Sequence, residues 1–206
     1  MGHSISLEDP ELDLDIKNDL VYVNIGKIIE VAGVLNDICP AETHLNQYDF
    51  EDIFSLCLKH PTKLFETLKE TLDGETEEVV SIYEAITAMT FLCHDEYEKK
   101  MTYIFQIFDF DQNFTLTKTE FELTVTAGCR ALTKLLKNVE TPSNKEIQEL
   151  ANSIFLRSDK NMSNTVTVEE LLEYFNSNYR LQNFLLIYTH STSHENAIRR
   201  FNEKLE

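Results

Sequence analysis

The clearest pattern in the chain is a polar stretch between two segments with helical apolar spacing. Before the stretch, apolar side chains recur at helical intervals, at Ile104, Phe105 and Phe108. Polar residues then dominate positions 109–117, and the apolar pattern resumes at Phe121. This order predicts a helix, a loop and a second helix.

The same order of polar loop and apolar helix occurs in two further places. Residues 159–170 repeat it legibly, and residues 73–84 repeat it more loosely. Counted from the first residue of each loop, position 8 is apolar and position 9 is a hydroxyl residue followed three residues later by Glu. That pairing is the signature of a capping box, so the exiting helices are expected to begin with their N-caps at Ser81, Thr117 and Thr167.

Oxygen-bearing side chains occupy alternate positions in these loops. An EF-hand calcium loop takes its ligands from positions 1, 3, 5 and 12 and from the backbone carbonyl of position 7, because a hard cation needs six or more converging oxygens. In loop 109–120 the expected ligands are Asp109, Asp111, Asn113, Thr115 through its carbonyl, and Glu120. In loop 159–170 they are Asp159, Asn161, Ser163, Thr165 through its carbonyl, and Glu170. In loop 73–84 a weak metal site is expected from Asp73, Glu75, Glu77 and Glu84.

One further unit fits before residue 73. A helical pattern is followed by a polar break and then by Leu45 and Asp49–Phe50, which places a degenerate loop near residues 37–49. This loop contains Pro40 and offers few ligand oxygens, so it is expected to be structural only.

Position 6 of each loop sets an expected limit on affinity. The chain turns sharply there and needs a positive φ, which glycine adopts most readily. Asn164 tolerates this conformation well. Phe114 should cost about 1–2 kcal/mol, which corresponds to about a tenfold loss of affinity. We expect calcium as the ion, with Mg²⁺ a second candidate in the same loops, at the weak end of the sensor range of about 10⁻⁷ to 10⁻⁵ M or beyond it.

The charge of the chain bears on its partners. Its 206 residues include 18 Lys and Arg and 36 Asp and Glu, which gives a net charge of -18. This balance argues against nucleic acid as a partner and favours cations or basic helices. No apolar stretch approaches the roughly 18 residues of a membrane span, and no secretory signal is visible, so an intracellular protein with reduced cysteines is expected.

Enzymatic activity is not expected. The chain has five glycines and no glycine-rich phosphate loop. His190 and His194 are four residues apart, but no third ligand or base lies near them in the sequence.

With these motifs in place, the chain resembles the neuronal calcium sensor group, the recoverin-like branch of proteins with four EF-hands. The resemblance runs from the initial Met1-Gly2, through a first loop with Cys39-Pro40, to "HPTKLFETL" and "NSNYRLQNFLLIY". It implies two lobes of paired EF-hands, an N-terminal myristoyl group, and a calcium-dependent apolar groove that binds a helix of a target protein. A calaxin-like, ciliary relative that regulates dynein belongs to the same broad set and stays open as an alternative.

The opening "MGHSIS" fits the N-myristoylation pattern, with Gly2 as the lipidated residue and Ser6 as the hydroxyl residue. One myristoyl chain binds a membrane only marginally, and acidic residues follow it here. We therefore expect reversible membrane contact, or a lipid held in the groove of this protein or of a partner.

The predicted fold is all-α, with two lobes of paired EF-hands, the first two units degenerate, and an extra C-terminal helix. The expected organisation is an acidic segment at 1–20, an N-terminal pair at 21–92, a C-terminal pair at 93–178 and a helical extension at 179–206. Residues 7–20 are expected to be disordered or to lie along a partner. The joint between the last two hands should break at Thr141-Pro142 and restart as a helix at Ser143.

The predicted function is that of a calcium-binding EF-hand sensor or adaptor that grips a helix of a target protein and regulates it. The expected location is the cytoplasm, with the cilium, the cytoskeleton or a membrane periphery as further candidates. The alternative is a calcium-independent, light-chain-like structural subunit of a large assembly, ciliary or axonemal in kind.

Overall fold

The structure, a computed structural model, describes residues 14–39, 43–72, 74–136 and 140–178. Within these residues the fold is mostly helical and of the all-α EF-hand type. Helix α1 (Leu14–Leu20) precedes four helix–loop–helix units, which we call the first to fourth hands. No helix in this part of the chain combines the length and the apolar character needed to cross a bilayer.

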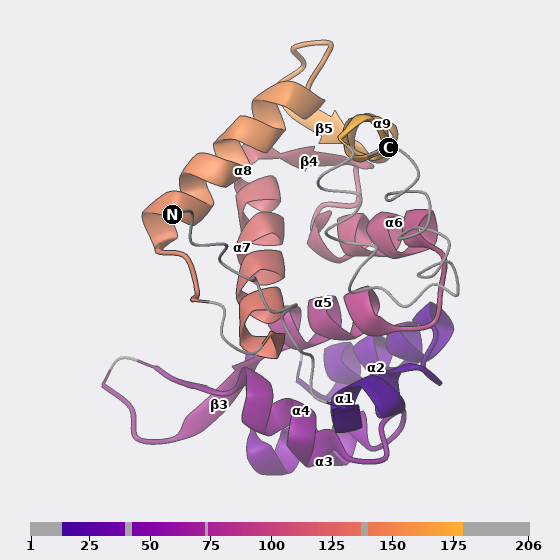
Figure 1. The fold of residues 1–206 in the computed structure, drawn as a ribbon, viewed down its shortest axis with the longest axis vertical. Helices are drawn as coiled ribbons and strands as arrows, with labels where there is room; N and C mark the ends of the chain where they lie inside the picture. Colours follow the sequence, from indigo (N-terminus) through magenta and orange to yellow (C-terminus); the bar gives the residue numbers. More distant parts are fainter. Residues whose placement is uncertain (1–13, 40–42, 73, 137–139, 179–206) are drawn as a thin grey trace, which may run out of the picture.

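The hands follow one another along the chain (Figure 1). The first hand consists of α2 (Ile25–Ile38), β1 (His44–Asn46) and α3 (Gln47–Phe54). The second consists of α4 (Pro61–Leu68), β2 (Glu70–Thr71), β3 (Glu78–Ser81) and α5 (Ile82–Leu92). The third consists of α6 (Tyr97–Phe108), β4 (Thr115–Thr117) and α7 (Lys118–Leu135). The fourth consists of α8 (Asn144–Ser158), β5 (Thr165–Thr167) and α9 (Val168–Ser177).

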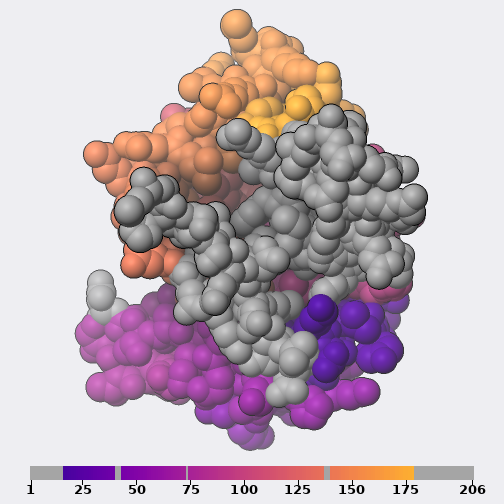
Figure 2. Space-filling model, viewed as in Figure 1, coloured from indigo at the N-terminus to yellow at the C-terminus, as the bar shows by residue number. Residues whose placement is uncertain are grey.

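Short antiparallel strands join the hands in pairs. In the first pair Leu45 of β1 lies opposite Val80 of β3, and in the second Leu116 of β4 lies opposite Val166 of β5. All four side chains are buried, which explains why position 8 of each loop is apolar. Figure 2 shows the first two hands at the bottom of the view and the fourth at the top.

The second hand departs from the regular loop shape. Helix α4 ends at Leu68, and β2 then pairs with the start of β3, with Glu70 opposite Val79 and Thr71 opposite Glu78. The chain between the two strands turns through Gly74, whose φ of 85° suits glycine. The result is a hairpin that projects from the side of the N-terminal half (Figure 1).

The N-caps confirm the predicted starts of the exiting helices. Ser81, Thr117 and Thr167 each accept a hydrogen bond from the backbone N–H three residues later. Thr117 and Thr167 form complete capping boxes with their glutamates, and so does Ser143 at the start of α8, as predicted. The predicted box at Ser81 is wrong in its second half, because the carboxylate of Glu84 turns away toward α7.

Helix α7 contributes to both apolar cores. Ala131 and Leu135, near its end, pack into the core of the first two hands, whereas Ala127 and Leu132 pack into the core of the last two. The helix is 18 residues long, so it spans about 27 Å. The predicted boundary between the pairs, at residues 92 and 93, stays a prediction, and α7 couples the two halves across it.

The acidic N-terminal segment is helical where the structure describes it. For residues 14–20, the expectation of disorder or of a partner-bound segment is wrong, because these residues form α1 and bury Ile16 and Leu20 in the N-terminal core. The two side chains are four residues apart and so share one helix face. The acylation of Gly2, the helical extension at 179–206 and its histidine pair lie outside the described residues.

Candidate metal centre

The loop of the third hand is built around the carboxylate of Asp109, the residue that caps the end of α6. Its Oδ1 accepts the backbone N–H of Asn113 at 3.1 Å, and its Oδ2 accepts that of Phe114 at 3.0 Å. These bonds bend the following residues around the carboxylate. Asp111 joins the same turn, since its Oδ2 accepts from the side-chain amide of Asn113 at 2.7 Å.

The turn requires two residues in the left-handed region. Phe114 at position 6 has a φ of 65°, as predicted for that position, and Gln112 at position 4 has a φ of 55°. A non-glycine residue in this region costs about 1–2 kcal/mol. The side chain of Phe114 is 81% exposed, so it adds no core packing to offset that cost.

Glu120 at position 12 closes the loop. Its Oε2 accepts from the backbone N–H of Thr117 at 2.9 Å and from the Thr117 hydroxyl at 2.7 Å. Its Oε1 accepts from the backbone N–H of Phe110 at 3.2 Å. One carboxylate in the first turn of α7 therefore holds both the beginning and the end of the loop.

The three carboxylates of this loop gather in one place. Single oxygens of Asp109, Asp111 and Glu120 lie within 4.8 Å of one another. Asp109 and Glu120 are each only 8% exposed. Among the described residues, no lysine, arginine or histidine forms an ion pair with any of the three. Like charges at this spacing repel one another, and a bound cation would relieve that repulsion. The cluster supplies negative charge and hard oxygen donors, which suit a divalent cation such as Ca²⁺.

The fourth hand repeats the scaffold with less charge. Asp159 accepts the backbone N–H groups of Ser163 at 2.9 Å and Asn164 at 3.0 Å, which matches Asp109 in the third hand. Asn164 has a φ of 63°, in agreement with the prediction for position 6. The carbonyl of Thr165, expected as a ligand, accepts from the Ser163 hydroxyl at 3.0 Å and so faces the inside of the turn.

Carboxylate number distinguishes the fourth hand from the third. Of its five predicted ligands, only Asp159 and Glu170 are charged, and Asn161 and Ser163 supply neutral oxygens. Fewer charged ligands weaken calcium binding. The loop therefore combines a well-suited position 6 with a weaker donor set.

In the second hand, Glu84 and the two described hairpin glutamates lie in different surroundings. Glu75 and Glu77 are exposed on the projecting hairpin, and Asp73 lies outside the described residues. Glu84 is 3% exposed, and its Oε2 lies 2.7 Å from the Nζ of Lys134 on α7. The weak metal site predicted for loop 73–84 stays a prediction.

Sequence reasoning missed two features of the candidate centres. The left-handed backbone at position 4, at Gln112 and at Met162 with a φ of 58°, carried no compositional signal because neither residue is glycine or asparagine. Lys134 was also missed, since it is 50 residues from Glu84 in the sequence. A pairing over that distance has no periodic signature.

Burial keeps three of the four cysteines protonated near neutral pH. All four lie in the described part of the chain, and no disulfide joins them there. Burial raises the pKa of the Cys57 and Cys93 thiols to about 11 and also raises that of Cys129. These thiols are therefore poor nucleophiles and poor metal ligands near neutral pH.

Comparison with known proteins gives distant relatives. No family model matches the chain. It is 23% identical over 137 residues to guanylyl cyclase-activating protein 1 of Gallus gallus, and 25% identical over 145 residues to guanylyl cyclase inhibitory protein of Lithobates pipiens. Each match covers 66% of this chain and 65% of the relative, so the chain spans somewhat less than two thirds of the length of these relatives.

The names of the two relatives indicate regulatory proteins. Both relatives are named as regulators of an enzyme, which agrees at a coarse level with the calcium-sensor resemblance and with a regulatory rather than an enzymatic protein. They do not favour the calaxin-like branch in particular.

Proposed function

We propose that this chain is a calcium-binding EF-hand sensor or adaptor that grips a helix of a target protein and regulates it. The observation that carries the proposal is the carboxylate cluster of Asp109, Asp111 and Glu120, which has no ion-pair partner among the described residues. Two of these carboxylates are largely buried. A divalent cation bound in this loop would offset the repulsion among the three carboxylates.

The third and fourth loops would each bind one ion through their own residues. Carboxylates at positions 1, 3 and 12 of the third loop, with the amide oxygen of Asn113 and the carbonyl of Thr115, would hold it there. Asp159, Asn161, Ser163, the Thr165 carbonyl and Glu170 would do so in the fourth. A bound Ca²⁺ supplies two positive charges, and Mg²⁺ is the second candidate in the same loops.

Glu120 connects the loop to the rest of the protein. It stands in the first turn of α7, and α7 packs into both apolar cores. Any rearrangement of its carboxylate therefore acts on a helix that reaches both halves of the molecule. We propose that residues 21–92 and 93–178 form the two EF-hand pairs of this sensor.

The target is proposed from the resemblance and from the relatives. Because both relatives are named for guanylyl cyclase, a guanylyl cyclase is the first target to test, through a helix bound in an apolar groove.

We further propose a cytoplasmic location, with the cilium, cytoskeleton or membrane periphery as alternatives. Acylation of Gly2 would add reversible membrane contact, and the intact mass of the native protein, with or without one C14 acyl group, tests it.

The alternative is a calcium-independent, light-chain-like subunit of a large assembly. Two observations favour it: Phe114 is held in a left-handed conformation that lowers affinity, and the position-12 glutamate of the second hand is already paired with a lysine. In that case the hands would clamp a partner without an ion.

Isothermal titration with calcium, with and without magnesium, separates the two functions. The wild type should show two binding events, and Glu120→Gln and Glu170→Gln should each remove one, because each loses the position-12 carboxylate. The double variant should bind none. Absence of calcium heat in the wild type would favour the alternative, as would capture of a purified guanylyl cyclase that is equal in calcium and in chelator.

A further inference from the structure

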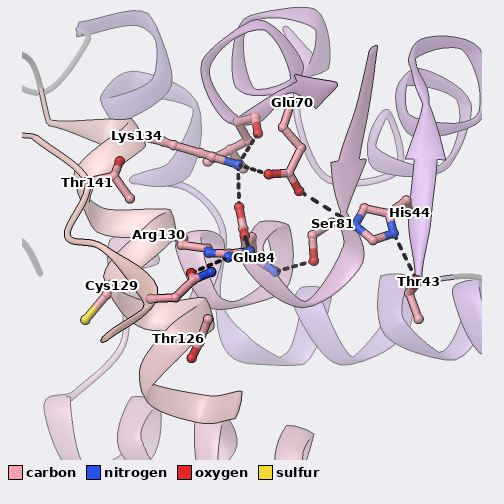
Figure 3. A network of polar contacts seen from close by, with 12 residues as sticks. Thr43, His44, Glu70, Ser81, Glu84, Thr126, Cys129, Arg130, Lys134 and Thr141 are labelled. Atoms are coloured by element: carbon pink, nitrogen blue, oxygen red, sulfur yellow. Dashed lines mark hydrogen bonds and ion pairs between the residues drawn. The ribbon is translucent and has the colours of Figure 1, made fainter. Parts of the chain in front are cut away.

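The end of α7 places a lysine ammonium inside the second hand. The Nζ of Lys134 lies 2.7 Å from Oε2 of Glu84, 2.9 Å from the carbonyl oxygen of Leu68 and 3.3 Å from Oε2 of Glu70 (Figure 3). An ammonium group has three N–H donors, so these three oxygens use all of them. All three belong to the second hand, at the end of α4, in β2 and in the first turn of α5.

This arrangement replaces the usual role of position 12. Glu120 folds back on the N-cap of its own helix, and so does Glu170. Glu84 occupies the equivalent position, yet its carboxylate, 3% exposed, points to α7 instead. Its other oxygen lies 3.7 Å from NH1 of Arg130, one turn before Lys134 on the same helix. The second hand thus receives its positive charge from the chain itself.

The same network reaches the first and fourth hands. Oε1 of Glu70 lies 3.6 Å from Nε2 of His44 in β1. NH2 of Arg130 donates to Oδ1 of Asn144, the first residue of α8, at 3.1 Å. Polar contacts from the last turns of α7 therefore link the first, second and fourth hands to the exiting helix of the third (Figure 3).

We propose that Lys134 is an internal cation of the second hand, and that its pairing with Glu84 latches α7 in place and thereby lowers the calcium affinity of loop 109–120. The second part rests on the proposed function. Glu120 and Lys134 lie on one continuous helix, about 21 Å apart along its axis. A reorientation of α7 at the loop must displace the ammonium from its three oxygens, and that cost is subtracted from binding.

The test uses Glu170→Gln as the parent, so that only loop 109–120 reports. Calcium affinity is measured by titration calorimetry for the parent, for Lys134→Met, for Glu84→Gln and for both together. Lys145→Met is the matched control, because among the described residues Lys145 forms its one ion pair with Glu149 on the surface of α8. It removes the same charge from an exposed site.

Glu84→Gln gives the sharpest result, because the latch and general electrostatics predict opposite signs. Loss of a negative charge should weaken calcium binding slightly, whereas release of the latch should tighten it by about fivefold or more. Lys134→Met should tighten it to a similar extent, and the double variant should add little to either single change. Lys145→Met should change affinity by less than about twofold.

Unchanged or weaker binding in Glu84→Gln overturns the latch. So does a Lys145→Met effect as large as that of Lys134→Met. A parent that binds no calcium refutes the proposed function and with it the effect on affinity. The internal ion pair is then decided by thermal unfolding of the same four proteins in chelator: non-additive losses support it, and additive losses refute it.

Discussion

The second and third hands have the same position-12 glutamate and opposite surroundings for it. In the third hand, Glu120 lies with two aspartates within 4.8 Å, and no described cation pairs with them. In the second hand, Glu84 lies 2.7 Å from a lysine ammonium that also contacts Glu70. The loop pattern alone does not distinguish the two, because the deciding residue is on a helix that belongs to another hand.

The second and third hands also differ in the geometry of their loops. Helix α6 runs directly to Asp109, so the third loop begins at its first predicted ligand. Helix α4 stops at Leu68, and the hairpin that follows carries Glu75 and Glu77 outward. Calcium binding is favoured by several converging carboxylates, and within the described residues only the third hand brings three of them together.

The largest expected effect is a drop in the free energy of unfolding when the lysine that pairs with Glu84 in the second hand is removed. Lys134→Met leaves Glu84 buried without its closest partner and should lower the free energy of unfolding by about 3 kcal/mol. Urea unfolding in chelator measures it. Lys145→Met should cost less than about 0.5 kcal/mol, since its ion pair is exposed. Equal losses in the two variants would mean that the ammonium of Lys134 is not a structural cation.

The next effect concerns position 6 of the third loop. Phe114→Gly removes the strain of a left-handed, exposed side chain and should tighten calcium binding to loop 109–120 by about tenfold. Asn164→Gly is the matched change in the fourth hand and should give a smaller gain, because asparagine tolerates the same backbone. Titration in the Glu170→Gln and Glu120→Gln backgrounds, respectively, isolates each loop. A larger gain at Asn164 would contradict the strain argument.

The smallest effect concerns the N-caps of the two exiting helices. Thr117→Ala breaks a reciprocal capping box, whereas Ser81→Ala removes a single 3.5 Å contact from the Glu84 N–H. Both should destabilise the protein by roughly 0.5–2 kcal/mol, the first more than the second. Urea unfolding without calcium gives the order. The reverse order would show that Glu84 also acts as a capping residue.

Much of the fold was predictable from the sequence because EF-hand loops carry local rules. The hydroxyl residues at position 9 predicted where α5, α7 and α9 begin, and the apolar residues at position 8 lie in the buried cross-strand pairs. The clustering of Asp109, Asp111 and Glu120 agrees with their predicted spacing, although whether they bind an ion stays a prediction. These features depend on residues within one loop and its neighbour.

The features that sequence reasoning missed depend on contacts between distant segments. The hairpin of β2 and β3 needs a strand register that the loop pattern does not specify. The burial of α1 depends on the core that receives Ile16 and Leu20. The pairing of Lys134 with Glu84 joins residues 50 positions apart. Each of these features depends on tertiary contacts, which local hydrophobic periodicity does not indicate.

Counting bound calcium ions by native mass spectrometry tests the central claim most directly. The account predicts two ions for the wild type, two for Glu84→Gln and one for Glu120→Gln, because Lys134 takes the place of an ion in the second hand while Glu120 is left to bind one. Three ions in the wild type that fall to two in Glu84→Gln would contradict the internal cation. No bound ion in the wild type would contradict the calcium sensor itself.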